Sequence, residues 1–239
     1  MNLVKKIALL STIIAIISCK EEAKQPKVIY EEKPTSAVTK KVDSSQIKIA
    51  DLPINMAGTN ILLHPVSDLR VSENNRIAYG SSKTYSVSYS VSNYDRFELT
   101  GYLENIKFQH KDSTALRALT NKKIQIQTVT YLSDFAEKTK KQILIYTVVD
   151  EDTNKDGKVD QNDIRSLYIS SINGTNFKKL SEKYNELIDW SLMLNQNKLY
   201  FRCIKDINKN GAFDKNDSVH YHYVNLLSGD LKVEEYNPI

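Results

Sequence analysis

From about Asp51 onward, apolar and polar residues alternate in a series of short segments rich in Tyr, Val, Ile and Thr. The clearest of these segments are Tyr85–Val91, Ile124–Tyr131, Ile143–Val149, Leu167–Ile172, Lys198–Ile204 and Val219–Leu226. Alternation with a period of two turns one face of a segment toward a core, so each is predicted to be a half-buried β-strand. We therefore expect an all-β domain of antiparallel strands, with one or two helical turns near Ser113–Leu119.

The strand pattern repeats along the chain. Asn105–Thr120 aligns with Ser166–Ser181 at an offset of 61 residues, and Tyr221–Val233 matches both more loosely. Each copy is predicted to be a strand, a tight turn and a strand, and Asn173-Gly174 is a typical hairpin turn. With a period of about 55–60 residues, the pattern indicates tandem antiparallel β-repeats.

One of these copies resembles a known repeat. Leu167–Ser181 contains a strand, an Asn-Gly turn, a second strand and a basic pair followed by Leu-Ser, and in this it resembles the repeats of TolB-type propellers. The resemblance implies a small or incomplete propeller-like array of three units, with a partial unit at Ile61–Tyr79. An irregular antiparallel β-sandwich whose hairpins look alike is the alternative.

Two twelve-residue segments at equivalent places in consecutive repeats, 54 residues apart, have the ligand spacing of EF-hand calcium loops. Oxygen-bearing side chains occupy positions one, three, five, nine and twelve, glycine at position six permits a sharp turn, and position seven offers its carbonyl. The predicted ligands of the first loop are Asp152, Asn154, Asp156, the carbonyl of Lys158, Asp160 and Asp163. Those of the second are Asp206, Asn208, Asn210, the carbonyl of Ala212, Asp214 and Asp217.

The two loops depart from the usual pattern at position twelve, which is Asp instead of Glu in both. A shorter carboxylate reaches less easily around an ion, so we expect two Ca²⁺ sites in the weak, extracellular range of affinities. The first loop carries four carboxylates and the second three, which predicts tighter binding by the first. Strands flank both loops, so we expect the ion to brace a hairpin, because a sensor of the helical type needs helices on either side.

The N-terminal segment has the features of a lipoprotein leader. Lys5 and Lys6 precede an apolar run of about eleven residues, which is too short to span a bilayer and typical of a signal peptide. Ile16-Ile17-Ser18-Cys19 follows and resembles the lipobox of bacterial lipoproteins, with Ile17 less small than that pattern prefers. The resemblance implies that residues 1–18 are a signal peptide and that Cys19 carries a lipid.

Lys20-Glu21-Glu22 resembles the surface-export signal of Bacteroidota lipoproteins. It implies an outer-membrane lipoprotein exposed at the cell surface, with the periplasmic face as the alternative. Residues 19–49 are rich in Lys, Glu, Ser and Thr and show no sustained apolar period, so they are predicted to be a flexible tether. Residues 50–239 are then the β-repeat domain.

The charge balance is small. The chain has 33 Lys and Arg against 29 Asp and Glu, a net charge of +4, and removal of Lys5 and Lys6 leaves about +2. Nucleic-acid binding needs a concentrated basic face, so we expect no nucleic-acid partner. The expected partners are the membrane, through the lipid anchor, and an unidentified protein or glycan.

A few other residues carry chemistry that the sequence alone leaves open. Cys203 is predicted to be a small core residue, and His220 and His222 lie on one face of a predicted strand, either as surface side chains or as metal ligands. The aromatic side chains that form either amphipathic strand positions or a sugar-binding face are Tyr79, Tyr85, Tyr89, Tyr94 and Tyr102.

The sequence shows no phosphate-binding glycine loop and no nucleophile elbow, so we expect a non-enzymatic, calcium-binding module for binding or assembly in the cell envelope. The alternatives are an envelope glycoside hydrolase, which needs paired carboxylates in a cleft, and an accessory lipoprotein that captures polysaccharide through aromatic rings.

Overall fold

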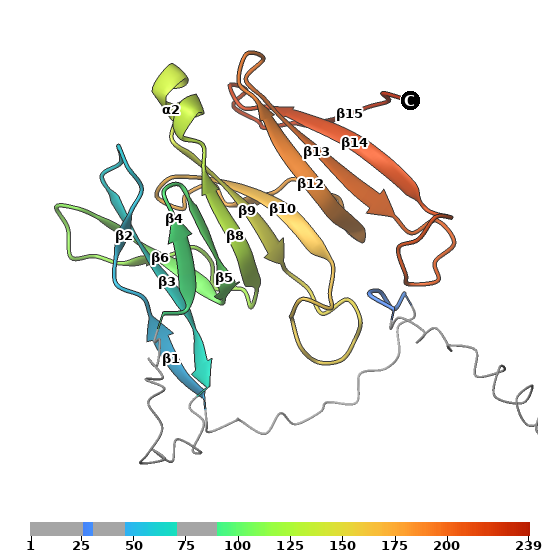
Figure 1. Ribbon diagram of the computed structural model, residues 1–239, viewed down its shortest axis with the longest axis horizontal. Helices are drawn as coiled ribbons and strands as arrows, with labels where there is room; N and C mark the ends of the chain where they lie inside the picture. Colours follow the sequence, from blue (N-terminus) through green and yellow to red (C-terminus); the bar gives the residue numbers. More distant parts are fainter. Residues whose placement is uncertain (1–25, 31–45, 71–89) are drawn as a thin grey trace, which may run out of the picture.

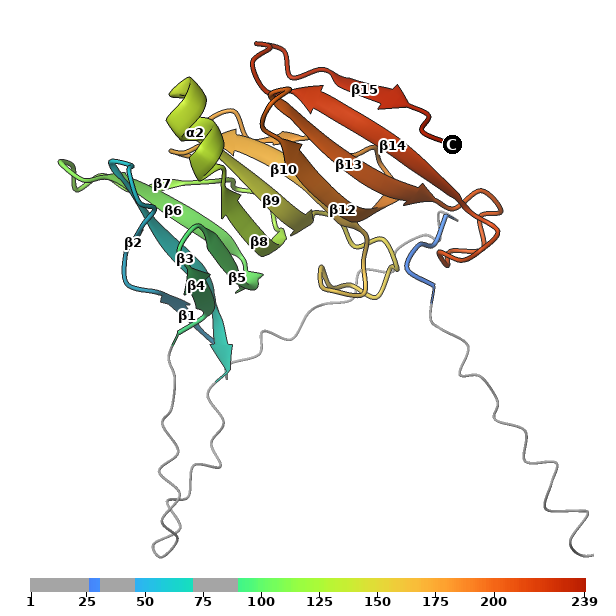
Figure 2. The same cartoon turned by 45° about the horizontal axis from the view of Figure 1, so that its top comes forward.

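The structure, a computed structural model, describes residues 26–30, 46–70 and 90–239. These residues form three antiparallel sheets and one short helix, α2 (Ser133–Thr139), so the all-β prediction is confirmed (Figure 1). Within the described ranges the sheets do not close into a barrel. They stack face to face in chain order, as in a sandwich of three layers (Figure 2).

The first sheet has the strand order β1-β3-β6-β7, with β2 paired to β3. Its strands are β1 (Gln46–Ala50), β2 (Ile54–Asn55), β3 (Ile61–Arg70), β6 (Asn105–His110) and β7 (Arg117–Ala118). The segment between β3 and β6 includes the hairpin of β4 (Ser92–Asp95) and β5 (Glu98–Leu103), which joins the edge of the second sheet. Two strands that precede β6 in the chain therefore extend the sheet of the second repeat.

The second and third sheets contain the next two repeats. The second continues the β4–β5 hairpin with β8 (Gln125–Tyr131), β9 (Ile143–Val149), β10 (Arg165–Ser171) and β11 (Lys178–Lys179). The third consists of β12 (Asn185–Met193), β13 (Lys198–Lys205), β14 (Ser218–Asn225) and β15 (Val233–Tyr236). Each repeat is a meander of four strands, and the aligned copies coincide with the hairpins β6–β7, β10–β11 and β14–β15.

The core lies in two layers, one on each face of the second sheet. Strand β9 shows why: Leu144 and Tyr146 pack in the cluster shared with the first sheet, whereas Ile143 and Ile145 pack in the cluster shared with the third. A strand that is buried on both faces has an almost continuous apolar sequence, as β9 has. In β13 of the third sheet, buried and more exposed residues alternate instead, and Leu199 is one of those that face the core.

Two expectations differ from the structure. Ser113–Leu119 is not helical; residues 113–116 have no regular secondary structure and lead into β7, because Ala118 pairs with Lys107 of β6. The helix that forms, α2, has only seven residues and ends at Lys140, whose φ of 64° is left-handed. It is too short to show a helical period in the sequence. In addition, β1 begins at residue 46, so the folded part starts before residue 50.

Among the residues described, no helix has the length and apolar character needed to span a membrane. Cys19, the leader and Tyr79, Tyr85 and Tyr89 lie outside the described residues, as does the predicted strand Tyr85–Val91 apart from its last two residues.

Candidate functional site: two wrapped loops and an N-terminal segment

The two predicted calcium loops occupy equivalent positions in consecutive repeats. Asp152–Asp163 connects β9 to β10, and Asp206–Asp217 connects β13 to β14, so each loop joins the second and third strands of its meander. Both loops lie at the same end of the molecule (Figures 1 and 2). The prediction that strands flank them is therefore confirmed.

The first loop is wrapped around its own side-chain oxygens. The two carboxylate oxygens of Asp152 accept hydrogen bonds from the amides of Asp156 (3.1 Å) and Gly157 (2.8 Å). The carboxylate of Asp163 accepts from the amides of Thr153 (2.7 Å), near the start of the loop, and Asp160 (3.0 Å). The loop thus closes on its first and twelfth residues.

The second loop repeats this conformation. The amide of Gly211 donates to Asp206 Oδ2 (2.7 Å), and the amides of Ile207 (3.1 Å) and Asp214 (2.8 Å) donate to the carboxylate of Asp217. These donors occupy positions six, two and nine, as they do in the first loop. Position six is left-handed in both loops, with φ of 85° at Gly157 and 81° at Gly211, which is why glycine is needed there.

The donor set of both loops suits a hard divalent cation. All the predicted ligands are oxygen atoms, as Ca²⁺ and Mg²⁺ require. Asp206 is only 5% exposed, and its Oδ1 is buried with no hydrogen-bond partner among the described residues. An unpaired buried carboxylate oxygen is costly, and a bound cation would satisfy it.

The first loop is more fully paired internally. Asp163 is 0% exposed, and its Oδ1 accepts hydrogen bonds from the amides of Thr153 and Asn154. Among the described residues, Oδ2 accepts a hydrogen bond only from the Asp160 amide, which leaves it a lone pair. In the described ranges, no three side chains of His, Cys, Asp or Glu converge as a metal cluster. The predicted sets depend instead on Asn oxygens and on one carbonyl from each loop.

An N-terminal segment that the sequence assigns to the tether lies against both loops. Residues 26–30 run beside them (Figures 1 and 2), and we call this segment the strap. The amides of Lys27 (2.7 Å) and Val28 (3.2 Å) donate to the Gly211 carbonyl, and the amide of Ile29 donates to the Thr153 carbonyl (2.9 Å). Val28 is 2% exposed. The strap therefore ties the second repeat to the third.

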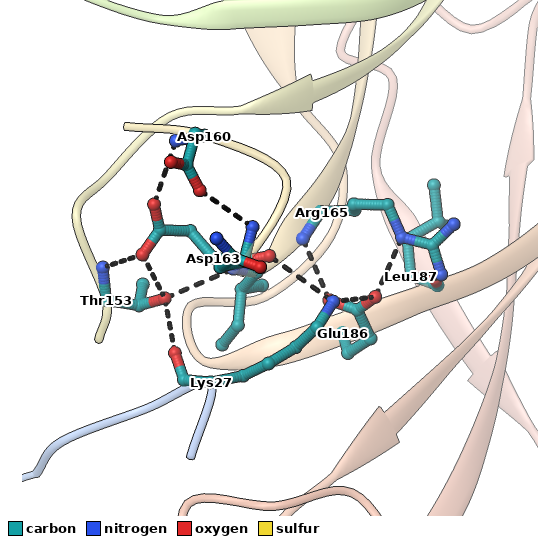
Figure 3. A network of polar contacts seen from close by, with 9 residues as sticks. Lys27, Thr153, Asp160, Asp163, Arg165, Glu186 and Leu187 are labelled. Atoms are coloured by element: carbon teal, nitrogen blue, oxygen red, sulfur yellow. Dashed lines mark hydrogen bonds and ion pairs between the residues drawn. The ribbon is translucent and has the colours of Figure 1, made fainter. Parts of the chain in front are cut away.

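Polar contacts extend from the strap into the body of the domain (Figure 3). Lys27 Nζ forms an ion pair with Glu186 of β12 (3.1 Å), and Arg165, at the start of β10, binds the same carboxylate through Nε (2.7 Å). The Thr153 hydroxyl donates to the Lys27 carbonyl (2.7 Å). Glu186 is buried, and two cations from different segments compensate its single negative charge.

One weak feature of the sequence indicates that the strap is buried. Val28-Ile29-Tyr30 is a short apolar run within a charged segment, and three residues are too few to establish a period. Tyr30 packs edge-on against Tyr184, and its hydroxyl lies near Asp206. Burial raises the pKa of Tyr30, and so do its hydrogen bond to the Asp206 carboxylate and the negative charge of that carboxylate.

The remaining candidates take part in packing. Cys203 is 0% exposed, and burial raises the pKa of its thiol to about 12, so the thiolate needed of a nucleophile is not formed near neutral pH. His222 is buried and stacks on Phe201, with ring centroids 4.9 Å apart. His220 lies beside it at 6.4 Å and contacts Glu235 through Nδ1 (2.6 Å).

The state of His222 predicts a pH dependence of stability. Burial lowers the pKa of His222 below its usual value of 6.5, so the native state disfavours the charged ring. The unfolded chain then binds the proton more readily, and the free energy of unfolding falls as pH drops through 6.5. We expect the melting temperature of His222→Phe to change less between pH 7.5 and 5.5 than that of the unmodified chain. Identical slopes, measured by thermal denaturation in excess chelator, would contradict this assignment.

No protein-family model matches the chain, and no curated protein matches it significantly.

Proposed function

We propose that this chain is a calcium-binding, non-enzymatic module for binding or assembly in a bacterial cell envelope, held at the outer membrane by a lipid on Cys19. The observation that carries the calcium part is the shared wrapped conformation of the two loops, together with the buried, unpaired Oδ1 of Asp206. The anchor is supported by the lipobox-like sequence alone, and surface exposure by the three residues after it.

The ion would serve as a brace. In each repeat the loop joins two strands of the meander, and calcium would fix its backbone by replacing water around the converging oxygens. Because the strap contacts Gly211 in one loop and Thr153 in the other, ordering of the loops would also hold the strap. Among the described residues, the lining of three clefts includes a single carboxylate, that of Asp51, so none of the three presents the carboxylate pair that glycoside hydrolysis uses.

The two loops differ at position five, which provides a matched test. Asp156 of the first loop corresponds to Asn210 of the second. Since ligand charge tunes calcium affinity, Asp156→Asn should weaken the first loop about tenfold and Asn210→Asp should tighten the second about tenfold. Titration calorimetry measures the calcium affinity of one loop while the other is weakened by Asn at position one. The first loop is measured in an Asp206→Asn background and the second in an Asp152→Asn background.

Position seven supplies the control for this experiment. At Lys158 the predicted ligand is the backbone carbonyl and not the side chain. Lys158→Ala, which introduces the residue found at Ala212 of the second loop, should therefore leave the calcium affinity nearly unchanged. In the unmodified chain the first loop should be the tighter, with dissociation constants of roughly 10⁻⁴–10⁻³ M. A tighter second loop would overturn the charge argument, and no calcium uptake would overturn the proposed function.

A further inference from the structure

A cleft of about 540 Å³ lies beside the first loop. Strands β4, β5 and β8 form one side, and the loop, the start of β10 and the strap form the other. Its principal lining side chains are polar or aromatic: Lys27, Asn93, Tyr102, Gln127, Gln161 and Arg165. The cleft thus draws on the first repeat, the second repeat and the N-terminal segment.

Two irregularities in the strands shape the floor of this cleft. Between Ile126 and Thr128 the pairing of β8 with β9 skips Gln127, which is an extra, bulged residue. The pairing of β5 with β8 shifts between Thr100 and Leu103, so β5 also carries an extra residue at this level. Bulges re-aim side chains and occur preferentially next to functional sites. Here they place Gln127 and Tyr102 in the wall of one cleft.

The first loop positions the aromatic side chain of the cleft. Tyr102 is 60% exposed, and its hydroxyl donates to Oε1 of Gln161 (3.1 Å), the tenth residue of the loop. An ordered loop therefore holds the Tyr102 ring. The ring then presents an apolar face to the cleft, with its polar end already paired.

The chemistry of the wall matches a hydroxyl-rich ligand. Each side-chain amide of Asn93, Gln127 and Gln161 carries both donors and an acceptor, as a sugar hydroxyl does. An exposed tyrosine ring suits the apolar face of a pyranose.

The charges in the wall favour an acidic ligand. Lys27 and Arg165 both pair with Glu186, which is not among the lining residues, so the three side chains together carry one net positive charge. In Figure 3 the two cations reach Glu186 from opposite sides. No acidic side chain lines this cleft within the described part of the chain.

We propose that this cleft is a binding site for acidic saccharides and that calcium in the first loop sets its geometry. The proposal rests on the proposed calcium function, because the loop contributes Gln161 and ends next to Arg165. It names the ligand class of the binding module and assigns it no hydrolytic step.

The test uses the mature chain in saturating calcium and tetrasaccharides of hyaluronan, chondroitin sulfate and alginate. Neutral cellotetraose and mannotetraose serve as comparison ligands. We expect saturable binding of at least one acidic tetrasaccharide and weaker binding of the neutral ones. Tyr102→Ala and Gln127→Ala should each weaken that binding about tenfold. Tyr94→Ala is the matched control, because Tyr94 is 42% exposed on β4 but does not line the cleft.

The outcomes separate the two proposals. Calcium uptake without binding of any acidic tetrasaccharide overturns the cleft assignment and leaves the calcium proposal standing. Binding that survives both cleft substitutions, or that is equal for neutral sugars, also overturns it. Binding that persists unchanged in excess chelator overturns the role of the loop, whereas failure of calcium uptake overturns the proposed function itself.

Discussion

Calcium in hundredfold excess over the dissociation constants should raise the melting temperature of the chelator-treated chain by roughly 10–20 °C. An ion that binds only the native state at this excess contributes about 2.7 kcal/mol per site. In a domain of about 190 residues, each kilocalorie per mole shifts the melting temperature by about 2–4 °C. Two loops that close on Asp163 and Asp217 should therefore give a shift that scanning calorimetry resolves easily.

The controls for this experiment separate specific binding from salt effects. NaCl at the same ionic strength should give a much smaller shift, because it screens charges without satisfying Asp206 Oδ1. The double variant Asp152→Asn/Asp206→Asn, which removes the position-one carboxylate from both loops, should lose most of the response to calcium. A melting temperature that is the same in chelator and in calcium would contradict the calcium proposal.

Gly211→Ala should destabilise the domain more than Gly157→Ala and release the strap. Both glycines have left-handed φ, so alanine at either position costs roughly 1–2 kcal/mol of backbone strain. Their surroundings differ: a Cβ at residue 211 would lie 2.3 Å from the Val28 carbonyl oxygen and 2.7 Å from Pro26 Cβ, whereas one at residue 157 would meet nothing within 4 Å. Loss of the buried Val28 contact should add about 2 kcal/mol.

Two measurements distinguish strap release from simple loop strain. Chemical denaturation gives the difference in the free energy of unfolding between the two variants. Trypsin cleavage after Lys27, followed by mass spectrometry, should be slow in Gly157→Ala and fast in Gly211→Ala, because the docked strap pairs the amides of Lys27 and Val28. Equal stability and equal cleavage rates in the two variants would show that the strap contributes little.

Patterns that are local in the sequence predict the structure correctly. The hairpin at Asn173-Gly174 and the strands β9 and β13 follow from turn chemistry and alternation within a few residues. The left-handed glycines of both loops also follow from spacing alone. The alternation pattern does not predict strand β12, because Ile188 is an extra residue between Leu187 and Asp189 and such a bulge breaks the period of two.

The sequence by itself determined the β-class and the two oxygen-lined loops, because each depends on residues within about a dozen positions of one another. It also determined the meander repeat, through the similarity of segments 61 residues apart. Only the tertiary structure decided that the second sheet is buried on both faces, that the strap joins Val28 to Gly211, and that Tyr102 reaches Gln161. These contacts join residues from different repeats, and no local period or spacing encodes which side chains meet when the sheets pack.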